Sequence, residues 1–480
     1  MHFYSLACYN SRNYATAPYI PADGSRKKER KMENKLTKKY GLFTAICMVV
    51  GIVIGSGIFF KTEAVLAKTG GDVMTGVLAF LITGAVMIIC SYTFSILAQK
   101  YEKVNGLVDY AEVALGEKYA YYVGWFMTMI YSPSLTGVLA WLSARYLCVL
   151  IGFENPVTGT ECMLLAGLFL VASFALNALS PILAGKFQVS GTIIKLVPLT
   201  LMAVVGTVKG LGNGQLLQNL GSSAATDAAA GSGALLTAVV ALAFAYEGWI
   251  IATSINAELK NAKRNLPIAL VLGSLIVVAV YVCYYLGICG AISVDELMAS
   301  SSEQAFVNTF GQTLGVLLTV FIVISCACTM NGLMLSSVRG MYSFAVRGLG
   351  PKPALFAEVD KHTNMPMASC IVGLFMSFAW MVYFFGANLT APWFGAFCFD
   401  SSELPIITIY ALYIPIFVSM FKDKEQGTFK RYIVPAAALC CSLFMVYAAI
   451  VAHGKAIPYY LIVFAVIMAL AIPFSKKKSI

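Results

Sequence analysis

The sequence Gly51-Ile-Val-Ile-Gly-Ser-Gly-Ile-Phe-Phe60 lies inside a long apolar run that begins near Tyr40. Its small residues Gly55, Ser56 and Gly57 stand where a helix through this run should be continuous. Glycine inside a helix costs about 1 kcal/mol relative to alanine, so the helix should unwind here. At membrane depth, irregular backbone is tolerated only where it is buried in protein or lines a cavity. The stretch therefore predicts either an unwound helix beside a cavity or a small-residue face for helix packing.

The composition of the chain is that of a polytopic membrane protein. Of its 480 residues, 59% are hydrophobic and 12% are charged, whereas a soluble domain carries about 25% charged residues. Apolar runs of about 20 residues, each long enough for a membrane helix, recur along the chain. The net charge of +10 does not indicate nucleic-acid binding, because most basic residues fall in short loops and at the ends, where they set topology.

The cysteine and histidine residues do not suggest a metal or catalytic centre. The thirteen cysteines show no zinc-like spacing, and the three histidines, His2, His362 and His453, lie at or outside the ends of the apolar runs. No nucleophile–base pair is evident in the sequence. We therefore expect no metal, no cofactor and no enzymatic activity.

Twelve transmembrane helices are expected in an all-α integral membrane fold. They fall near 40–68, 72–99, 119–151, 161–181, 187–209, 234–258, 266–291, 306–346, 366–386, 391–420, 432–452 and 457–474. Residues 37–475 should form one transmembrane domain. Residues 1–36 are polar and should form a disordered cytoplasmic tail. They do not resemble a signal peptide, because no short apolar core with a cleavage site follows them. Met32 offers a shorter start, so whether residues 1–31 belong to the native protein is left open.

The charges of the loops predict the orientation of the chain. One set of loops carries most of the lysines and arginines, for example Lys100 and Lys260, whereas the opposite set carries acidic residues such as Asp72, Glu154 and Asp295. Because basic loops face the cytoplasm, we expect both termini to be cytoplasmic in a multi-pass protein of the cell membrane.

The sixth expected span has a second interruption, with Glu247 and Gly248 inside the apolar sequence Leu242 to Ile250. A carboxylate inside the membrane is costly and by default marks a functional site. Interruptions in the first and sixth spans are typical of an inverted five-plus-five repeat. We therefore expect a first repeat over 40–209, a second over 234–420, and two accessory helices over 432–474.

The two breaks offer complementary polar backbone groups. Unwinding near Ser56 exposes amide N–H groups at the start of the half-helix beginning around Ile58, and a helix N-terminus favours a carboxylate. Unwinding near Tyr246 frees carbonyl groups from about Leu242 to Ala245, which suit an ammonium group. Amide donors opposite carbonyl acceptors fit the zwitterion of an α-amino acid.

Two buried charges belong to this region, and each has more than one interpretation. Glu247 could pair with a cation, carry a proton, or hold the bend by accepting backbone N–H bonds. Lys195, flanked by apolar residues in the fifth span, could stand where a sodium ion would otherwise sit, or could satisfy carbonyl groups between packed helices. Either role of Lys195 would tether the unwound first span.

Asp400 and Glu403 are three residues apart in the tenth expected span and should share one helical face. Neighbouring carboxylates can raise one another's pKa and carry a proton. Alternatively, this face lies near the outer mouth and is wetted by solvent. Lys61, Glu63 and Arg145 are interpreted as gate or vestibule charges.

Several motifs resemble the amino acid–polyamine–organocation superfamily, and most closely its bacterial L-type amino acid transporters. They are Gly51 to Phe59, Phe244-Ala-Tyr-Glu-Gly-Trp249, Glu258-Leu-Lys-Asn-Ala-Lys-Arg-Asn-Leu-Pro267, and Gln188 with Thr192 and Lys195. The match extends over the first ten expected spans. It departs at Asn105-Gly-Leu-Val-Asp-Tyr110, where the family usually has Pro-Lys-x-Gly-Gly.

The resemblance implies a leucine-transporter-type inverted repeat and alternating access without sodium. It places the substrate carboxylate on the backbone of Gly55, Ser56 and Gly57. It places the α-amino group on carbonyl groups of Ile52 or Val53 and of Phe244 and Ala245, within a break that runs through Tyr246, Glu247 and Gly248. Phe244 would be a lid, Tyr281 would link the site to the unwound helices, and Lys195 would replace the sodium site.

We therefore expect a secondary amino acid transporter that exchanges neutral L-amino acids or facilitates their transport. The alternative is a proton-coupled symporter using Glu247 or the pair Asp400 and Glu403, because that pair is not part of the family pattern. A sensor is disfavoured because no soluble output domain is present, and a channel would not need unwound substrate sites. The expected partners are the substrate and the lipid bilayer, with no nucleic acid and no accessory subunit.

Overall fold

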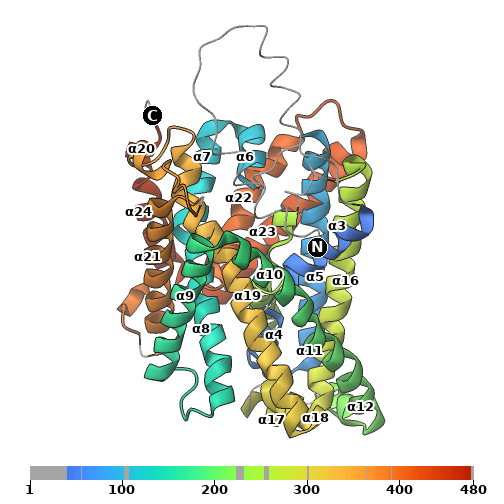
Figure 1. Cartoon of the computed structure of the whole chain (residues 1–480). Coiled ribbons are helices and arrows are strands. Elements are labelled where there is room, and N and C mark those ends of the chain that lie inside the picture. The colour runs from blue at the N-terminus through green and yellow to red at the C-terminus, as the bar shows by residue number, and fades with distance from the viewer. Residues whose placement is uncertain are drawn as a thin grey trace.

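A computed structural model describes residues 41–55, 57–101, 107–222, 232–252, 259–299, 302–363, 365–390 and 392–476. Within these ranges the regular elements are helices, and they stand roughly side by side in one bundle (Figure 1). The prediction of an all-α fold is thus confirmed for the described part of the chain. The expected tail, residues 1–36, lies outside the described residues.

The helices of the first half of the chain begin with the interrupted first helix and end with a bent pair. They are α3 (Leu42–Val53), α4 (Gly57–Lys68), α5 (Val73–Lys100), α6 (Leu107–Leu115), α7 (Glu117–Phe126), η1 (Met127–Tyr131), α8 (Ser132–Ile151), α9 (Thr160–Leu179), α10 (Pro181–Ile194), α11 (Leu196–Leu201), η2 (Met202–Gly206), α12 (Thr207–Gly212) and α13 (Gln215–Ser222).

The helices of the second half begin with another interrupted helix. They are α14 (Ser232–Ala243), α15 (Trp249–Ala252), α16 (Ala262–Ala291), α17 (Val294–Ala299), α18 (Ser302–Phe310), α19 (Gln312–Ala345), α20 (Pro353–Phe356), α21 (Met367–Phe384), η4 (Phe385–Leu389), η5 (Gly395–Phe397), α22 (Leu404–Met420), η6 (Phe429–Ile433), α23 (Val434–His453), α24 (Ile457–Ala469) and η7 (Ile472–Phe474).

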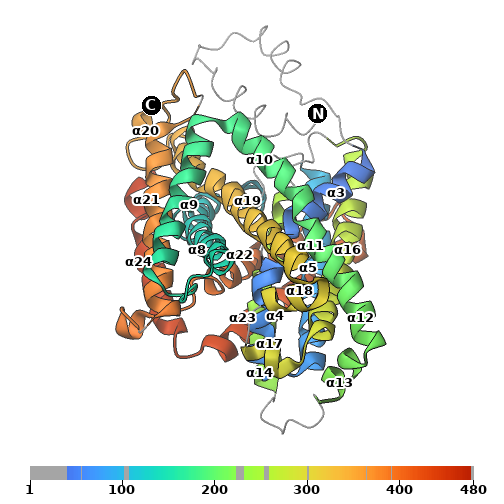
Figure 2. The ribbon, with the colours of Figure 1, turned by 60° about the horizontal axis from the view of Figure 1, so that its bottom comes forward.

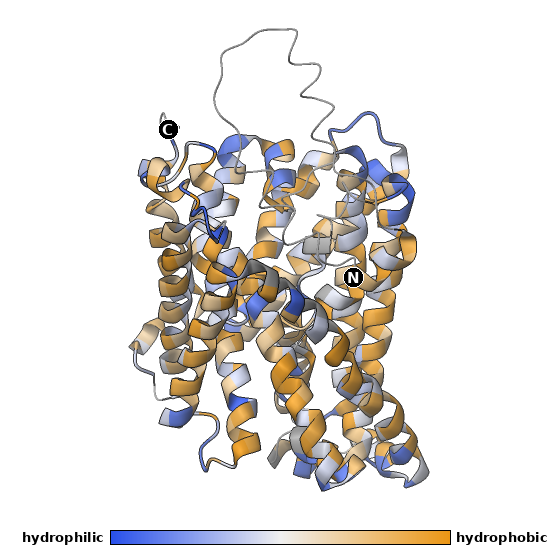
Figure 3. Cartoon of the chain, viewed as in Figure 1, coloured by the Kyte–Doolittle hydropathy of each residue, from blue (hydrophilic) through white to orange (hydrophobic). Residues whose placement is uncertain are grey.

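Many of these helices could cross a membrane. By length and apolar composition, eight helices of the described residues qualify, or nine if the bent pair Leu196–Gly212 and Gln215–Gly221 is one span. Shorter apolar helices, Leu42–Gly51, Gly233–Ala243 and Leu404–Met420, lie in the expected first, sixth and tenth spans. Residues of high hydropathy predominate in the middle of the bundle, and hydrophilic residues gather mainly toward its two ends (Figure 3). The chain is a multi-pass membrane protein, whereas the number twelve and the inverted repeat stay predictions.

The first helix is interrupted between α3 and α4. Ile54 leaves the helical conformation with φ −66° and ψ 101°, although its N–H still bonds to the Val50 carbonyl at 2.9 Å. Residues 244–248 similarly separate α14 from α15, and Gly248 has a φ of 104°, which favours glycine. Both interruptions lie where the sequence predicts them.

The interrupted helices pack among long continuous ones. Helix α16 packs against α3 and α5, and α14 packs against α4, α5 and α23. Helix α19 runs obliquely between α8 and α9 on one side and α11 and α16 on the other (Figures 1 and 2). Small residues permit these approaches: a Cβ at Gly273 of α16 would lie 2.7 Å from the Val49 side chain of α3. The two breaks are thereby held inside the bundle.

The tenth expected span, 391–420, is helical only from Leu404 onward. Before it, the Asp400 Oδ1 accepts N–H bonds from Ser402 and Glu403 at 2.7 and 3.0 Å, as in an Asx turn, and Pro405 fits the first helical turn. Asp400 therefore lies in a turn, and the prediction that Asp400 and Glu403 share a helical face is wrong. The eighth expected span, 306–346, is likewise divided at Gly311, whose φ is 80°.

Candidate functional site

The two helix breaks touch each other through their backbones. A Cβ added to Gly57, the first residue of α4, would lie 2.8 Å from the Ala245 Cα and 3.2 Å from the Phe244 carbonyl oxygen. That approach leaves no room for a side chain, so glycine is needed at this position. The chain thus brings together Gly57, Phe244 and Ala245 as predicted from the sequence. Ser56 lies outside the described residues, and so does the side chain of Ile52.

Tyr281 of α16 joins the two breaks. Its buried hydroxyl lies 3.1 Å from the Val53 carbonyl oxygen and 3.0 Å from the Ala245 carbonyl oxygen. Carbonyl groups at the end of a helix lack intrahelical partners and must be satisfied by other groups. Tyr281 therefore links both interruptions by sharing its one O–H proton between the two carbonyl groups, and it leaves each carbonyl oxygen a second lone pair.

Lys195 ties the fifth helical segment to the first. The residue lies between α10 and α11 and is 2% exposed, and its Nζ donates to the Gly51 carbonyl oxygen at 2.6 Å. A buried ammonium group is stable only if it is hydrogen-bonded or paired. The contact holds the last turn of α3 directly before the break.

Two side chains of the second break have different surroundings. The Phe244 ring is 9% exposed and has the Lys61 Nζ 5.5 Å from its centroid. The Tyr246 hydroxyl donates to the Phe80 carbonyl oxygen of α5 at 3.0 Å, and its ring lies edge-on to Tyr281 at 5.0 Å. The Tyr246 side chain is therefore used to anchor the break to neighbouring helices.

Glu247 lies in an aromatic environment. Both oxygens of its carboxyl group are buried without a hydrogen bond of good geometry among the described residues, although the Tyr131 hydroxyl and the Gly248 N–H lie close to the group. Tyr131 of η1 and Tyr410 and Tyr413 of α22 lie near this carboxyl group. The three roles considered for Glu247 stay predictions.

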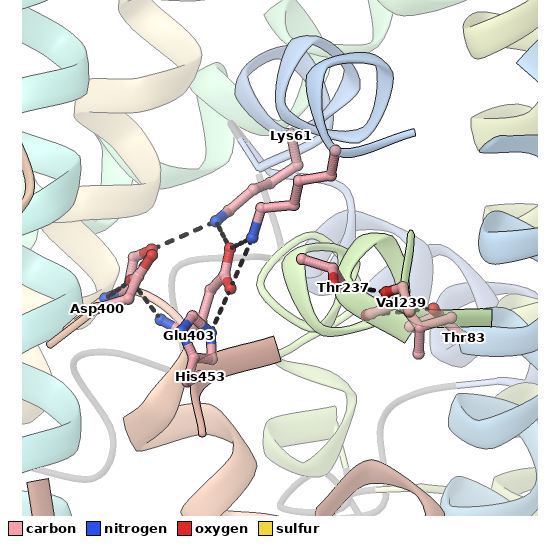
Figure 4. Close-up of polar contacts among 10 residues, drawn as sticks. Lys61, Thr83, Thr237, Val239, Asp400, Glu403 and His453 are labelled. Carbon is pink, nitrogen blue, oxygen red and sulfur yellow. Dashed lines mark hydrogen bonds and ion pairs between the residues drawn. The ribbon is translucent and has the colours of Figure 1, made fainter. Parts of the chain in front are cut away.

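Glu403 is the centre of an ionic cluster that the sequence did not reveal (Figure 4). Its carboxylate, 1% exposed, lies 2.8 Å from the Lys61 Nζ, 3.0 Å from the Lys68 Nζ and 2.9 Å from the His453 Nε2. Lys61 also donates to the Ser402 Oγ at 3.3 Å. Asp400 bonds its own turn and Glu403 faces cations, and the proton role considered for this pair stays a prediction.

Part of this cluster could have been predicted from the separation of its lysines in the sequence. Lys61 and Lys68 are seven residues apart, so they share one face of α4. Glu403 is 342 residues from Lys61, and no local pattern joins them. His453, placed by the sequence at a span end, pairs with Glu403 through the last turn of α23.

A second ion pair attaches the other side of α4 to α8. The Arg145 Nη2 lies 2.8 Å from the Glu63 Oε2, and the Arg145 side chain is 9% exposed. The Arg145 guanidinium carbon also lies 6.0 Å from the Phe60 ring centroid and 5.9 Å from that of Trp141. Lys61, Glu63 and Arg145, predicted as gate charges, all lie in these two ionic contacts. No group of three or more metal-ligating side chains occurs among the described residues.

This architecture is that of a multi-pass membrane protein whose two interrupted helices meet at a buried polar site. The chain belongs to the amino acid permease family of the amino acid–polyamine–organocation superfamily, whose sequence profile matches residues 40–472. The family predicted from the motifs is thus confirmed.

Curated relatives are amino acid transporters and exchangers. The serine/threonine exchanger SteT of Bacillus subtilis (strain 168) is 29% identical over 84% of this chain and 87% of its own. The b(0,+)-type amino acid transporter 1 of Mus musculus is 26% identical over 87% and 84%, respectively. The human cystine/glutamate transporter is 24% identical over 72% of this chain and 69% of its own. These relatives are consistent with a transporter that is not an enzyme.

Proposed function

We propose that this protein is a sodium-independent secondary transporter that exchanges neutral L-amino acids by alternating access. The observation that carries the proposal is the meeting of the two helix breaks, where Gly57 lies against Ala245 and one hydroxyl, that of Tyr281, reaches carbonyl groups of both. A site of this kind presents amide donors and carbonyl acceptors a short distance apart, which is what an α-amino acid zwitterion requires.

The substrate carboxylate would bind the amide groups of Gly55, Ser56 and Gly57 at the start of α4, where the helix dipole favours negative charge. The α-amino group would bind carbonyl oxygens of Ile52 or Val53 and of Phe244 or Ala245. Tyr281 holds these carbonyl groups in place without using all their lone pairs. Phe244 would cover the bound substrate.

Sodium independence is supported by Lys195. Its ammonium group already neutralises the partial negative charge at the end of α3 by bonding to the Gly51 carbonyl. A carrier with a fixed cation at this place does not need a sodium ion to organise the broken helix.

The proposal that the substrates are neutral is supported by the ion pairs that nearby charged side chains form within the protein. Lys61 and Glu403 pair with each other, and Arg145 pairs with Glu63, so these groups are occupied by protein partners. The relatives differ in the amino acids they are named for, which are serine and threonine in one and cystine and glutamate in another. The choice of neutral substrates therefore rests on this chain's own contacts.

The remaining expectations are part of the same proposal. Residues 37–475 would form one domain containing an inverted five-plus-five repeat, with both termini in the cytoplasm. The transporter would need no accessory subunit. Proton symport through Asp400 and Glu403 is not favoured, since Glu403 is paired with two lysines.

Counterflow in proteoliposomes tests the proposed function. Uptake of labelled serine or another neutral amino acid should be faster into vesicles preloaded with unlabelled substrate than into empty ones, with or without sodium. Equal uptake into empty vesicles that a protonophore abolishes would instead establish symport. A competition series with neutral, acidic and basic amino acids would then test the substrate class.

A further inference from the structure

The ionic cluster around Glu403 connects one half of the first helix to the far end of the chain (Figure 4). Lys61 and Lys68 belong to α4, which begins at the substrate site, whereas Glu403 directly precedes α22 and His453 ends α23. The proposed binding of substrate uses none of these four residues. Lys61 and Glu403 are nevertheless among the more deeply buried charges of the described chain, at 2% and 1% exposed, whereas Lys68 and His453 are 25% and 14% exposed.

The two carboxylate oxygens of Glu403 are shared among three cationic or ionisable partners. Oε1 accepts from the Lys61 Nζ at 2.8 Å and from the Lys68 Nζ at 3.0 Å. Oε2 lies 3.1 Å from the Lys68 Nζ and 2.9 Å from the His453 Nε2. Lys68 and His453 therefore approach the same oxygen from different helices.

Lys61 also connects this cluster to the proposed lid of the substrate site. Its Nζ lies 5.5 Å from the centroid of the Phe244 ring and 5.1 Å from that of Phe60, within the range of a cation–π contact. A movement of α4 away from α22 would therefore separate Lys61 from Glu403 and change the surroundings of the Phe244 ring.

Such a movement would leave Glu403 without its two lysines. Losing the partners of an ion pair is unfavourable for the charge that remains unless another cation compensates it. His453, which stays beside Glu403 on the α22–α23 side, is the group able to replace the lost charge. Imidazole takes up a proton between about pH 5 and pH 8.

We propose that Glu403 anchors a gate on the α4 side of the site, which Lys61 and Lys68 close and which a proton on His453 helps to open. The proposal rests on the alternating-access function proposed above. In the closed gate, a protonated His453 competes with Lys68 for Oε2 and repels the α4 lysines. In the open gate, the protonated His453 balances the negative charge of Glu403. Both effects favour opening in acid.

The described elements next to His453 carry these further charged residues. The turn before α22 contributes Asp400, which accepts bonds from Ser402 and the Glu403 N–H. Helix α5, which packs against α23, is capped at its start by Asp72 and ends at Lys100, and Lys455 follows α23 by two residues. Helix α14, which packs against α4 and α23, has no titratable residue over Ser232–Ala243.

The gate differs from a proton-coupling site in one consequence. The proton enters and leaves His453 on the same side of the membrane, so it should change the rate of exchange without being carried across. Acid on the α4 side should thus speed opening while amino acid exchange stays free of net proton movement.

A cysteine at a buried position of α4 next to Lys61 would report the movement of this helix. Thr62 of α4 is fully buried, so T62C in the full chain in lipid nanodiscs should react slowly with a methanethiosulfonate reagent at pH 7.5. Adding E403Q or K61M should increase the labelling rate at least about fivefold, the lower end of typical coupling between two states. The matched control is K100M, which breaks the ion pair of Lys100 with Asp423 and should not increase labelling.

H453Q tests the proton directly, since glutamine keeps a hydrogen-bond donor but does not take up a proton. Labelling of T62C should rise between pH 7.5 and pH 5.5 with His453 present and should not rise in H453Q. Slow labelling in both E403Q and K61M, or an acid-induced rise that survives in H453Q, would overturn the proposal.

Two further readouts separate the gate from the proposed function. Acidification of the vesicle lumen during exchange, followed with an enclosed pH dye, would overturn a gate that carries no net proton. The expected labelling pattern in protein that exchanges no amino acid would support the gate and contradict the proposed function. Variants enter the comparison only if they elute as the parent does in size-exclusion chromatography.

Discussion

The Nζ of Lys195 lies 2.6 Å from the carbonyl oxygen of Gly51, which joins the junction of α10 and α11 to the last turn of α3. The helix that receives this bond ends two residues later, at Val53. The Tyr281 hydroxyl then reaches the Val53 and Ala245 carbonyl oxygens. Two side chains from other helices thus satisfy the backbone beside the break and keep α3 in a defined position relative to α14.

Replacing Lys195 with alanine should reduce amino acid exchange about tenfold or more, because a hydrogen bond to a charged group contributes roughly 1.5–3 kcal/mol. The protein should still insert and purify as a single species. Initial rates of counterflow, corrected for protein content, would measure the effect. Lys260→Ala, at an exposed position, is the matched control, and a K195A rate equal to that of this control would contradict the assigned role.

Tyr281→Phe should raise the KM for substrate roughly fivefold with a smaller change in maximal rate, since one hydrogen bond contributes about 1 kcal/mol. The ring would remain packed against Tyr246, so the fold should persist. The substrate dependence of counterflow measures this split. Tyr119→Phe removes a hydroxyl that bonds to the Leu412 carbonyl away from the breaks, and it should leave the KM unchanged. A Y281F variant with the parent KM would argue against the bridge.

Gly57→Val should abolish substrate binding, because even a Cβ at this position would lie 2.8 Å from the Ala245 Cα. Binding can be measured by substrate-induced thermal stabilisation of the purified protein. Gly41→Val is a suitable control, since a Cβ there meets nothing within 4 Å. Full stabilisation of G57V by substrate would place the binding site elsewhere.

The Glu63–Arg145 pair should couple α4 to α8 in the resting protein. In a double-mutant cycle with Glu63→Gln and Arg145→Met, we expect a coupling of roughly 1 kcal/mol in the free energy of unfolding, which is within the usual range for contacting residues. The partial exposure of Glu63, 19%, limits the value through solvent screening. Additive effects of the two substitutions would show that the pair does not stabilise this contact.

The sequence was sufficient to locate both helix breaks. Consecutive small residues at Gly55 to Gly57 and an acidic residue beside Gly248 are local features, and they weaken a helix wherever the chain places it. The family motifs also identified Lys195 and Tyr281 as residues of this region. In the structure, their side chains form hydrogen bonds with backbone carbonyl groups next to the breaks. The roles assigned to these residues in transport stay predictions.

The tenth span shows where local reasoning failed. The apolar pattern of 391–420 suggested a continuous helix, but the Asp400 side chain competes for backbone N–H groups and forms a turn before Leu404. With that turn, Glu403 faces α4 and α23 instead of sharing a helical face with Asp400. The ionic cluster with Lys61, Lys68 and His453 follows from this orientation.

By itself, the sequence determined the membrane environment, the all-helical architecture, the family and the positions of the two breaks, because hydrophobicity and backbone propensity act over neighbouring residues. Only the tertiary structure decided which groups meet across long separations. Glu403 and Lys61, 342 residues apart, and Lys195 and Gly51, 144 residues apart, are brought together by helix packing. Inside a membrane bundle, a charge or carbonyl group without a partner has a high free-energy cost, so each such group needs one. The fold decides which residue becomes that partner.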